Sequence, residues 1–192
     1  PGDVSSQFVS ALLLALPLLP GDSTLTLTSV PESAPYIAMT EEVLAAAGIS
    51  LYRTGSRYRI PGGQRYRLPS PLTVEGDWSA AAFFLCAGAM SREGIAVDGL
   101  SLTTRQGDSA LLPLLRQMGA EVNLSSGCIT VRKGRLRAID IDARPIPDLI
   151  PPLSVLAAAA EGGSHIQNAR RLRYKESDRL QGIAELLNSL GG

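Results

Sequence analysis

The chain has 192 residues, enough for one large domain or two small ones. Its 45% hydrophobic and 19% charged residues are typical of a globular protein with a substantial core. The formal net charge is zero, which excludes a bulk electrostatic attraction to nucleic acid or to an anionic membrane. With 5% aromatic residues, the chain also offers no evident stacking surface for nucleic-acid bases.

The first predicted element is an apolar helix over Phe8–Leu19. No basic residue precedes this run, and Asp3 stands before it, which argues against a signal peptide. The run is too short to span a bilayer, and Pro17 interrupts it. We therefore expect a buried helix.

A strand over Ser23–Val30, a helix over Tyr36–Ala47 and a hairpin over Ser50–Ile60 are predicted next. A linker rich in Pro, Gly and Arg follows over Pro61–Pro71 and is the best candidate for a domain boundary. The first basic residue of the chain lies in the hairpin, and further arginines follow closely. We interpret them as a solvated sheet face: Arg53, Arg57, Arg59, Arg65 and Arg67.

The same order of elements recurs twice further along the chain. The second round is predicted as a strand over Leu72–Glu75, a helix after Asp77, a strand over Gly94–Leu100, a helix over Ser109–Met118 and a hairpin over Glu121–Val131. The third is a strand over Ile139–Ile141, a helix after Asp148, a strand over Gly163–Asn168 and a helix over Ser177–Leu190.

Three aspartates mark this repeat. Asp3, Asp77 and Asp148 each precede an apolar helix, as an N-cap would, and are separated by 74 and 71 positions. The fold class is therefore α/β, built from repeated β-α-β-α-β-β units with mixed sheets and helices. We expect residues 79–141 to form a complete unit with a four-stranded mixed sheet. Because the pattern starts and stops within a unit, we expect an internal segment of a longer protein.

The cysteines and the histidine indicate no metal site. Cys86 and Cys128 are far apart in the sequence and lack metal-ligand spacing. We therefore expect no disulfide framework, and we expect a reducing, cytoplasmic compartment. Cys86 lies in the apolar run Ala80–Ala89 and is interpreted as a core residue. His165 is the only histidine and is interpreted as structural.

The segment Arg173–Arg179 is the strongest candidate for chemistry. Five of its seven residues are charged, with both signs interleaved, where a helical pattern begins. Helix starts favour anions because unpaired amides and the helix dipole lie there. Such a cluster can hold a phosphate and place an acid or base beside it. A solvated helix start with local ion pairs is the alternative.

An ordered set of motifs resembles the 5-enolpyruvylshikimate-3-phosphate synthase family over essentially the whole chain. The motifs are Gly2–Phe8, Ser33–Tyr36, Glu75–Asp77, Arg105–Asp108, Ile146–Asp148 and Leu172–Leu180. Members of this family fold as two domains of three repeats each. The resemblance implies that residues 1–72 are the last part of the first domain, 73–78 the crossover and 79–192 part of the second domain.

The resemblance also implies an activity. The family transfers the enolpyruvyl group of phosphoenolpyruvate to the 5-hydroxyl of shikimate-3-phosphate and releases phosphate. It implies no metal or organic cofactor, no nucleic acid and no membrane partner. Its remaining partners would be the N- and C-terminal segments of the same enzyme, and without them we expect the chain to be inactive.

Residue roles follow from the resemblance, position by position. It implies that shikimate-3-phosphate contacts Ser5, Ser6, Gln7, Ser33, Tyr36, Asp148 and Lys175. Lys175 and Arg179 would bind phosphoenolpyruvate, and the catalytic groups would be Asp148, Lys175 and Glu176, with Glu176 the candidate proton donor. Helix capping is the alternative for Ser5, Ser6 and Gln7 and for Asp148.

Two other functions stay open. The related enolpyruvyl transferase acting on UDP-N-acetylglucosamine shares the repeat, but the strings Ser5–Gln7 and Lys175–Arg179 favour the shikimate enzyme. The second is a non-catalytic repeat fragment that binds anions weakly.

Overall fold

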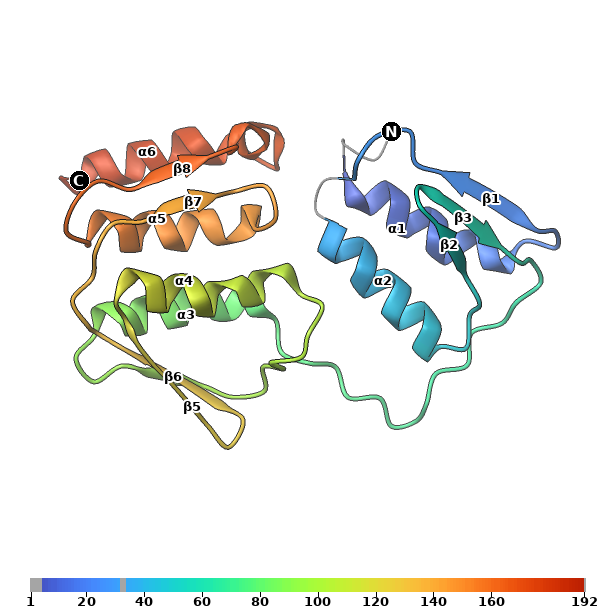
Figure 1. Cartoon of the computed structure of the whole chain (residues 1–192), viewed down its shortest axis with the longest axis horizontal. Coiled ribbons are helices and arrows are strands. Elements are labelled where there is room, and N and C mark those ends of the chain that lie inside the picture. Colours follow the sequence, from blue (N-terminus) through green and yellow to red (C-terminus); the bar gives the residue numbers. More distant parts are fainter. Residues whose placement is uncertain (1–4, 32–33, 192) are drawn as a thin grey trace. The chain divides into compact units, whose positions relative to one another are not determined.

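The computed structural model describes residues 5–31 and 34–191 (Figure 1). By its contacts the chain divides into two compact units. The first unit comprises the chain up to Val74 together with Arg105–Gly107, and the second comprises Glu75–Thr104 and the chain from Asp108 onward.

The first unit packs two helices on a small sheet. Its elements are α1 (Ser6–Ala15), the 3-10 turn η1 (Leu16–Leu18), β1 (Ser23–Thr26), α2 (Ala34–Ala46), β2 (Tyr52–Thr54) and β3 (Arg57–Ile60). The strands are antiparallel in the order β1-β3-β2. Along β3, Tyr58 and Ile60 are buried while Arg57 and Arg59 are exposed, which confirms a solvated arginine face on this strand.

The helix predicted over Phe8–Leu19 forms, but the expectation that it is buried is wrong. Val9 and Leu13 enter the core of the first unit, whereas Phe8 is 62% exposed and Leu12 43% exposed. A helix turns its side chains in every direction, and α1 contacts α2 on one side only, so its other apolar side chains stay in solvent.

The second unit holds the larger core. Its elements are α3 (Trp78–Met90), β4 (Ile95–Val97), η2 (Gly107–Ala110), α4 (Leu111–Met118), β5 (Glu121–Ser125), β6 (Cys128–Arg132), β7 (Asp140–Asp142), η3 (Pro147–Leu149), α5 (Ile150–Ala158), β8 (His165–Gln167), η4 (Arg170–Tyr174) and α6 (Arg179–Ser189). Asp77 caps α3 as predicted, by accepting from the Ser79 amide at 2.8 Å. Trp78 and Leu85 are fully buried, and the Trp78 ring donates to the Ser101 carbonyl at 3.1 Å.

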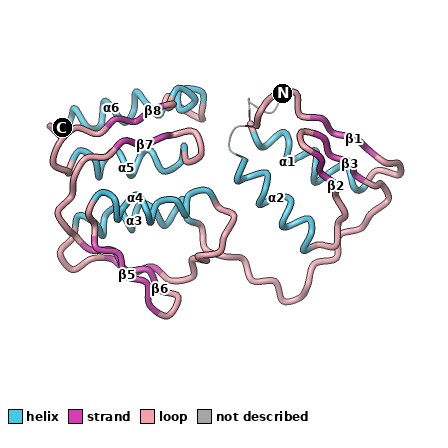
Figure 2. The backbone as a smooth tube through the Cα atoms, in the orientation of Figure 1, coloured by secondary structure: helices cyan, strands magenta, loops and turns pink. Residues whose placement is uncertain are grey.

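The sheet of the second unit differs from the predicted one. β4, β6 and β5 form a three-stranded antiparallel sheet in the order β4-β6-β5. β7 instead pairs in parallel with β8, and Figure 2 shows these two strands side by side. The four-stranded mixed sheet is therefore wrong, because the α5 crossover returns β8 alongside β7. Within the three-stranded sheet, Ile95 of β4 pairs with Val131 of β6. The strand predicted over Leu72–Glu75 is absent, and Val74 is 83% exposed.

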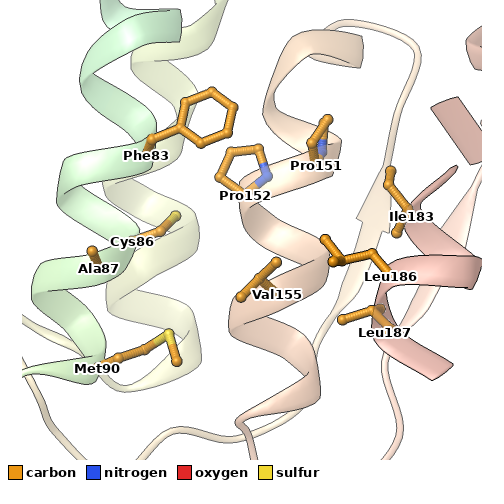
Figure 3. A pocket seen from close by; sticks show the side chains of 10 residues that line it. All are labelled: Phe83, Cys86, Ala87, Met90, Pro151, Pro152, Val155, Ile183, Leu186 and Leu187. Atoms are coloured by element: carbon orange, nitrogen blue, oxygen red, sulfur yellow. The ribbon is translucent and has the colours of Figure 1, made fainter. Parts of the chain in front are cut away.

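The helices of the second unit leave an apolar groove. Figure 3 shows Phe83 and Met90 of α3 facing Pro152 and Val155 of α5, with Leu186 of α6 beside them. Cys86 lines its floor and is buried as predicted, and burial raises the pKa of its thiol to about 12. Within the described residues, no helix is both long and apolar enough to cross a membrane.

Candidate functional site

The charged segment near the C-terminus lies between two helical elements. Lys175 and Glu176 occupy the turn between η4 and α6, and Arg179 is the first residue of α6. Asp178 caps α6 by accepting from the Gln181 amide at 3.0 Å, and it also accepts from Arg173 at 2.8 Å. The cap fixes where α6 begins and therefore the point from which the Arg179 side chain extends.

Asp148 is positioned by a different element. It is the central residue of η3, between Pro147 and the buried Leu149. The alternative of a helix cap is wrong for Asp148, because Leu149 holds the N-cap position of α5 and makes no side-chain cap bond. The stiff proline-flanked turn instead leaves the carboxylate available to side chains from α6.

The structure brings Asp148, Lys175, Glu176 and Arg179 together. Arg179 Nη1 lies 2.6 Å from Asp148 Oδ1, and its Nη2 lies 2.8 Å from Glu176 Oε2. Lys175 Nζ lies 3.7 Å from the same Asp148 oxygen. One guanidinium thus joins two carboxylates beside an ammonium group. We call these four residues the charged cluster.

Exposure separates the members of the charged cluster. The side chains of Asp148, Lys175 and Arg179 are 23–25% exposed, while Glu176 is 77% exposed. Its own backbone amide and the Arg179 guanidinium lower the pKa of Glu176. Glu176 is therefore held in the ionised form while it is paired with Arg179. Such an arrangement can bind anions and exchange protons once an anion displaces a carboxylate from the guanidinium.

The remaining predicted site residues lie in the first unit. Ser5 is the N-cap of α1, with its hydroxyl accepting from the Gln7 amide at 3.2 Å, so capping is confirmed for this serine. Ser6 is 8% exposed, Gln7 is exposed, and Tyr36 lies in the first turn of α2. Figure 1 shows α1 and α2 starting at the same end of this unit. Ser33 lies outside the described residues.

One buried acid was not predicted as a site residue. Asp108 is the second residue of η2, is 2% exposed, and accepts a hydrogen bond from the Ser79 hydroxyl. The sequence signal was present in the motif Arg105–Asp108, but a Gly-Asp pair before a helix also fits a simple cap. Within the parts of the chain that the structure describes, no group of His, Cys, Asp and Glu could hold a metal ion.

Solved structures define the class of fold. An EPSP synthase from Acinetobacter baumannii superposes with a TM-score of 0.73 and 26% identity, over 94% of this chain and 42% of that protein. The enolpyruvyl transferase NikO from Streptomyces tendae superposes with a TM-score of 0.55 and 22% identity, over 76% of this chain and 35% of that protein. The chain has the enolpyruvyl transferase type of fold.

Sequence comparison narrows the class to one family. The profile of EPSP synthase (3-phosphoshikimate 1-carboxyvinyltransferase) matches residues 1–192. A 3-phosphoshikimate 1-carboxyvinyltransferase from Methanothrix thermoacetophila is 45% identical over 192 residues, which are 99% of this chain and 45% of the relative. The chain belongs to the EPSP synthase family, and it spans somewhat less than half the length of the curated relatives it matches.

Proposed function

We propose that this chain supplies part of the active site of an enzyme that transfers the enolpyruvyl group of phosphoenolpyruvate to the 5-hydroxyl of shikimate-3-phosphate. The observation that carries this proposal is the charged cluster, in which Arg179 pairs with Asp148 and Glu176 beside Lys175. Membership of the EPSP synthase family supports it. We also propose a cytoplasmic setting, which the free thiols of Cys86 and Cys128 support.

The reaction needs an anion clamp and three proton transfers. The 5-hydroxyl oxygen forms a bond to C2 of phosphoenolpyruvate, while the C2=C3 electron pair takes a proton at C3. The tetrahedral adduct then loses a proton from C3 as the C2–O bond to phosphate breaks and the double bond returns. Asp148 is suited to accept the hydroxyl proton, and Arg179 and Lys175 to bind the anionic groups of the substrates.

The ion pairs suggest how Glu176 becomes a proton donor. While Arg179 bonds to Glu176, the carboxylate is stabilised in its ionised form. A phosphate or carboxylate of phosphoenolpyruvate would compete for the same guanidinium. Loss of that partner raises the pKa of Glu176 and favours the protonated form, which can then deliver a proton to C3. Binding of phosphoenolpyruvate and protonation of Glu176 would therefore be coupled.

We assign the polar residues of the first unit to shikimate-3-phosphate. Ser5, Ser6 and Gln7 lie at the start of α1, where backbone amides and the helix dipole favour phosphate. Tyr36 adds a phenolic hydroxyl near the start of α2. The family resemblance gives Ser33 the same role.

The test uses the complete enzyme that carries this segment, with phosphate release as the assay. Glu176→Gln is expected to lower kcat by about 100-fold or more, the scale of a lost proton donor, with little change in the KM for shikimate-3-phosphate. Arg179→Ala is expected chiefly to raise the KM for phosphoenolpyruvate. Arg135→Ala is the control, since Arg135 pairs with Glu161 on the surface. Kinetics within about twofold of wild type for both cluster variants would refute the proposal.

A further inference from the structure

Asp108 is the most buried carboxyl of the second unit that the proposed reaction does not use. Its side chain is 2% exposed, and its Oδ2 accepts from the hydroxyl of Ser79, the second residue of α3. Its other oxygen, Oδ1, is buried without a hydrogen-bond partner among the described residues. A buried, unpartnered oxygen is costly for a neutral acid and far more costly for a carboxylate.

This carboxyl lies within electrostatic reach of the charged cluster. The turn η3, which carries Asp148, packs against α3, which carries Ser79. Burial is the main cause that raises the pKa of Asp108, and the negative charges of Asp148 and Asp77 raise it further. The hydrogen bond from Ser79 and the positive charge of Lys175 lower it. The charges of Asp148 and Lys175 therefore both act on the Asp108 carboxyl.

The two carboxyls have unequal partners. Asp148 has Arg179 at 2.6 Å and Lys175 at 3.7 Å, so a negative charge on it is compensated. Asp108 has a neutral hydroxyl on one oxygen and no partner on the other. Two neighbouring carboxyls in a poorly solvated site share one negative charge more readily than they hold two. Of the two carboxyls, Asp148 is the better site for the negative charge and Asp108 the better site for the proton.

We propose that Asp108 is a positioning residue, which keeps a proton next to Asp148 so that the single negative charge of the pair faces Lys175 and Arg179. A negative charge on Asp108 would compete with Asp148 for Lys175. Loss of the Asp108 side chain would remove the hydrogen bond that joins Ser79, in the first turn of α3, to η2. The assignment rests on the proposed function of the charged cluster.

A titration of the 192-residue chain tests the proton directly, with ¹³C-labelled aspartate carboxyls followed by NMR. We expect the Asp108 midpoint to lie above the ordinary aspartate value of about 3.9. Asp148→Asn should lower this midpoint and Lys175→Met should raise it, each by roughly 1 pH unit or less. Asp140→Asn on exposed β7 is the matched control and should leave it unchanged. An ordinary midpoint, or one that responds to neither cluster variant, would overturn the proposal.

Kinetics of the complete enzyme supply the second readout. Asn cannot ionise and keeps the shape of the protonated acid, so Asp108→Asn should retain kcat within about threefold, while Asp108→Ala should lose about tenfold or more with KM unchanged. Equal, large losses in both variants would show that an ionised Asp108 is needed and would overturn the proposal. If Asp108→Ala does not fold, the Asn variant and the titration still decide. Wild-type kinetics for Glu176→Gln and Arg179→Ala would refute the proposed function, yet leave the titration result standing.

Discussion

Tyr58 joins three elements of the first unit through one side chain. Its fully buried ring belongs to β3, and its hydroxyl donates to Glu41 of α2 at 2.5 Å. Arg53 of β2 pairs with the same carboxylate at 3.0 Å, with its guanidinium carbon 5.2 Å from the centre of the Tyr58 ring. Burial, followed by the bond to Glu41, raises the pKa of Tyr58 well above its ordinary value.

We expect Tyr58→Phe to destabilise the first unit by about 1.5–3 kcal/mol at neutral pH, the usual value of a hydrogen bond to a charged group. The pH dependence has a definite sign. A folded-state pKa above the unfolded value of about 10 gives stability that is complete below pH 10 and is lost as the pH rises further. Urea unfolding at neutral and alkaline pH should therefore show the wild type losing its advantage over the variant. A constant difference between them above pH 10 would contradict this account.

At the scale of elements, Gly119 ends α4 in a way that other residues cannot. Its φ is 93°, and its amide donates to the Arg116 carbonyl at 3.0 Å. A Cβ at this position would also collide with the carbonyl oxygen of Arg135, in the segment between β6 and β7. The glycine therefore both stops the helix and lets the returning chain approach it.

Gly119→Ala is expected to cost clearly more than the ~1–2 kcal/mol of left-handed strain alone, because the clash with Arg135 adds to it. Gly99→Ala is the matched control in the same unit, with a φ of 81° and open space around the added methyl. Urea titrations followed by circular dichroism give both values. Equal losses of unfolding free energy in the two variants would mean that the close approach of Arg135 does not contribute to the cost of Gly119→Ala.

Elements with local signals were the predictable ones. The capping Asp77 and the hairpin over Glu121–Val131 were predicted from the sequence and are confirmed, since each depends on neighbours a few residues away. The pairing of β7 with β8 depends on where a crossover returns, and short strands carry no signal for that choice. In the candidate site, Lys175 and Arg179 are close in the sequence, so their grouping could be predicted. The hydrogen bond from Arg179 to Asp148 joins residues 31 positions apart, and no local pattern predicts it.

At the scale of the whole molecule, the relatives set an expectation for activity. The chain corresponds to about 45% of the length of a family member, so more than half of such a protein has no counterpart here. Each missing charged contact to a phosphate or carboxylate costs on the order of 2–4 kcal/mol in the transition state.

We therefore expect the 192-residue chain alone to show no measurable phosphate release from shikimate-3-phosphate plus phosphoenolpyruvate. The complete enzyme as one polypeptide, assayed under the same conditions, should turn over and serves as the positive control. Turnover by the isolated chain at ordinary enzyme rates would show that these residues suffice for catalysis.

The one tryptophan of the chain gives the two units different optical properties. Trp78 is fully buried at the first residue of α3, next to Ser79, which bonds to Asp108. Selective excitation of the indole therefore reports on the second unit alone, and the emission shifts to longer wavelength when water reaches that ring. Four of the five tyrosines lie in the first unit, so tyrosine emission reports mainly on the other part of the chain. The unfolding of each unit can thus be followed separately in one sample without an attached dye.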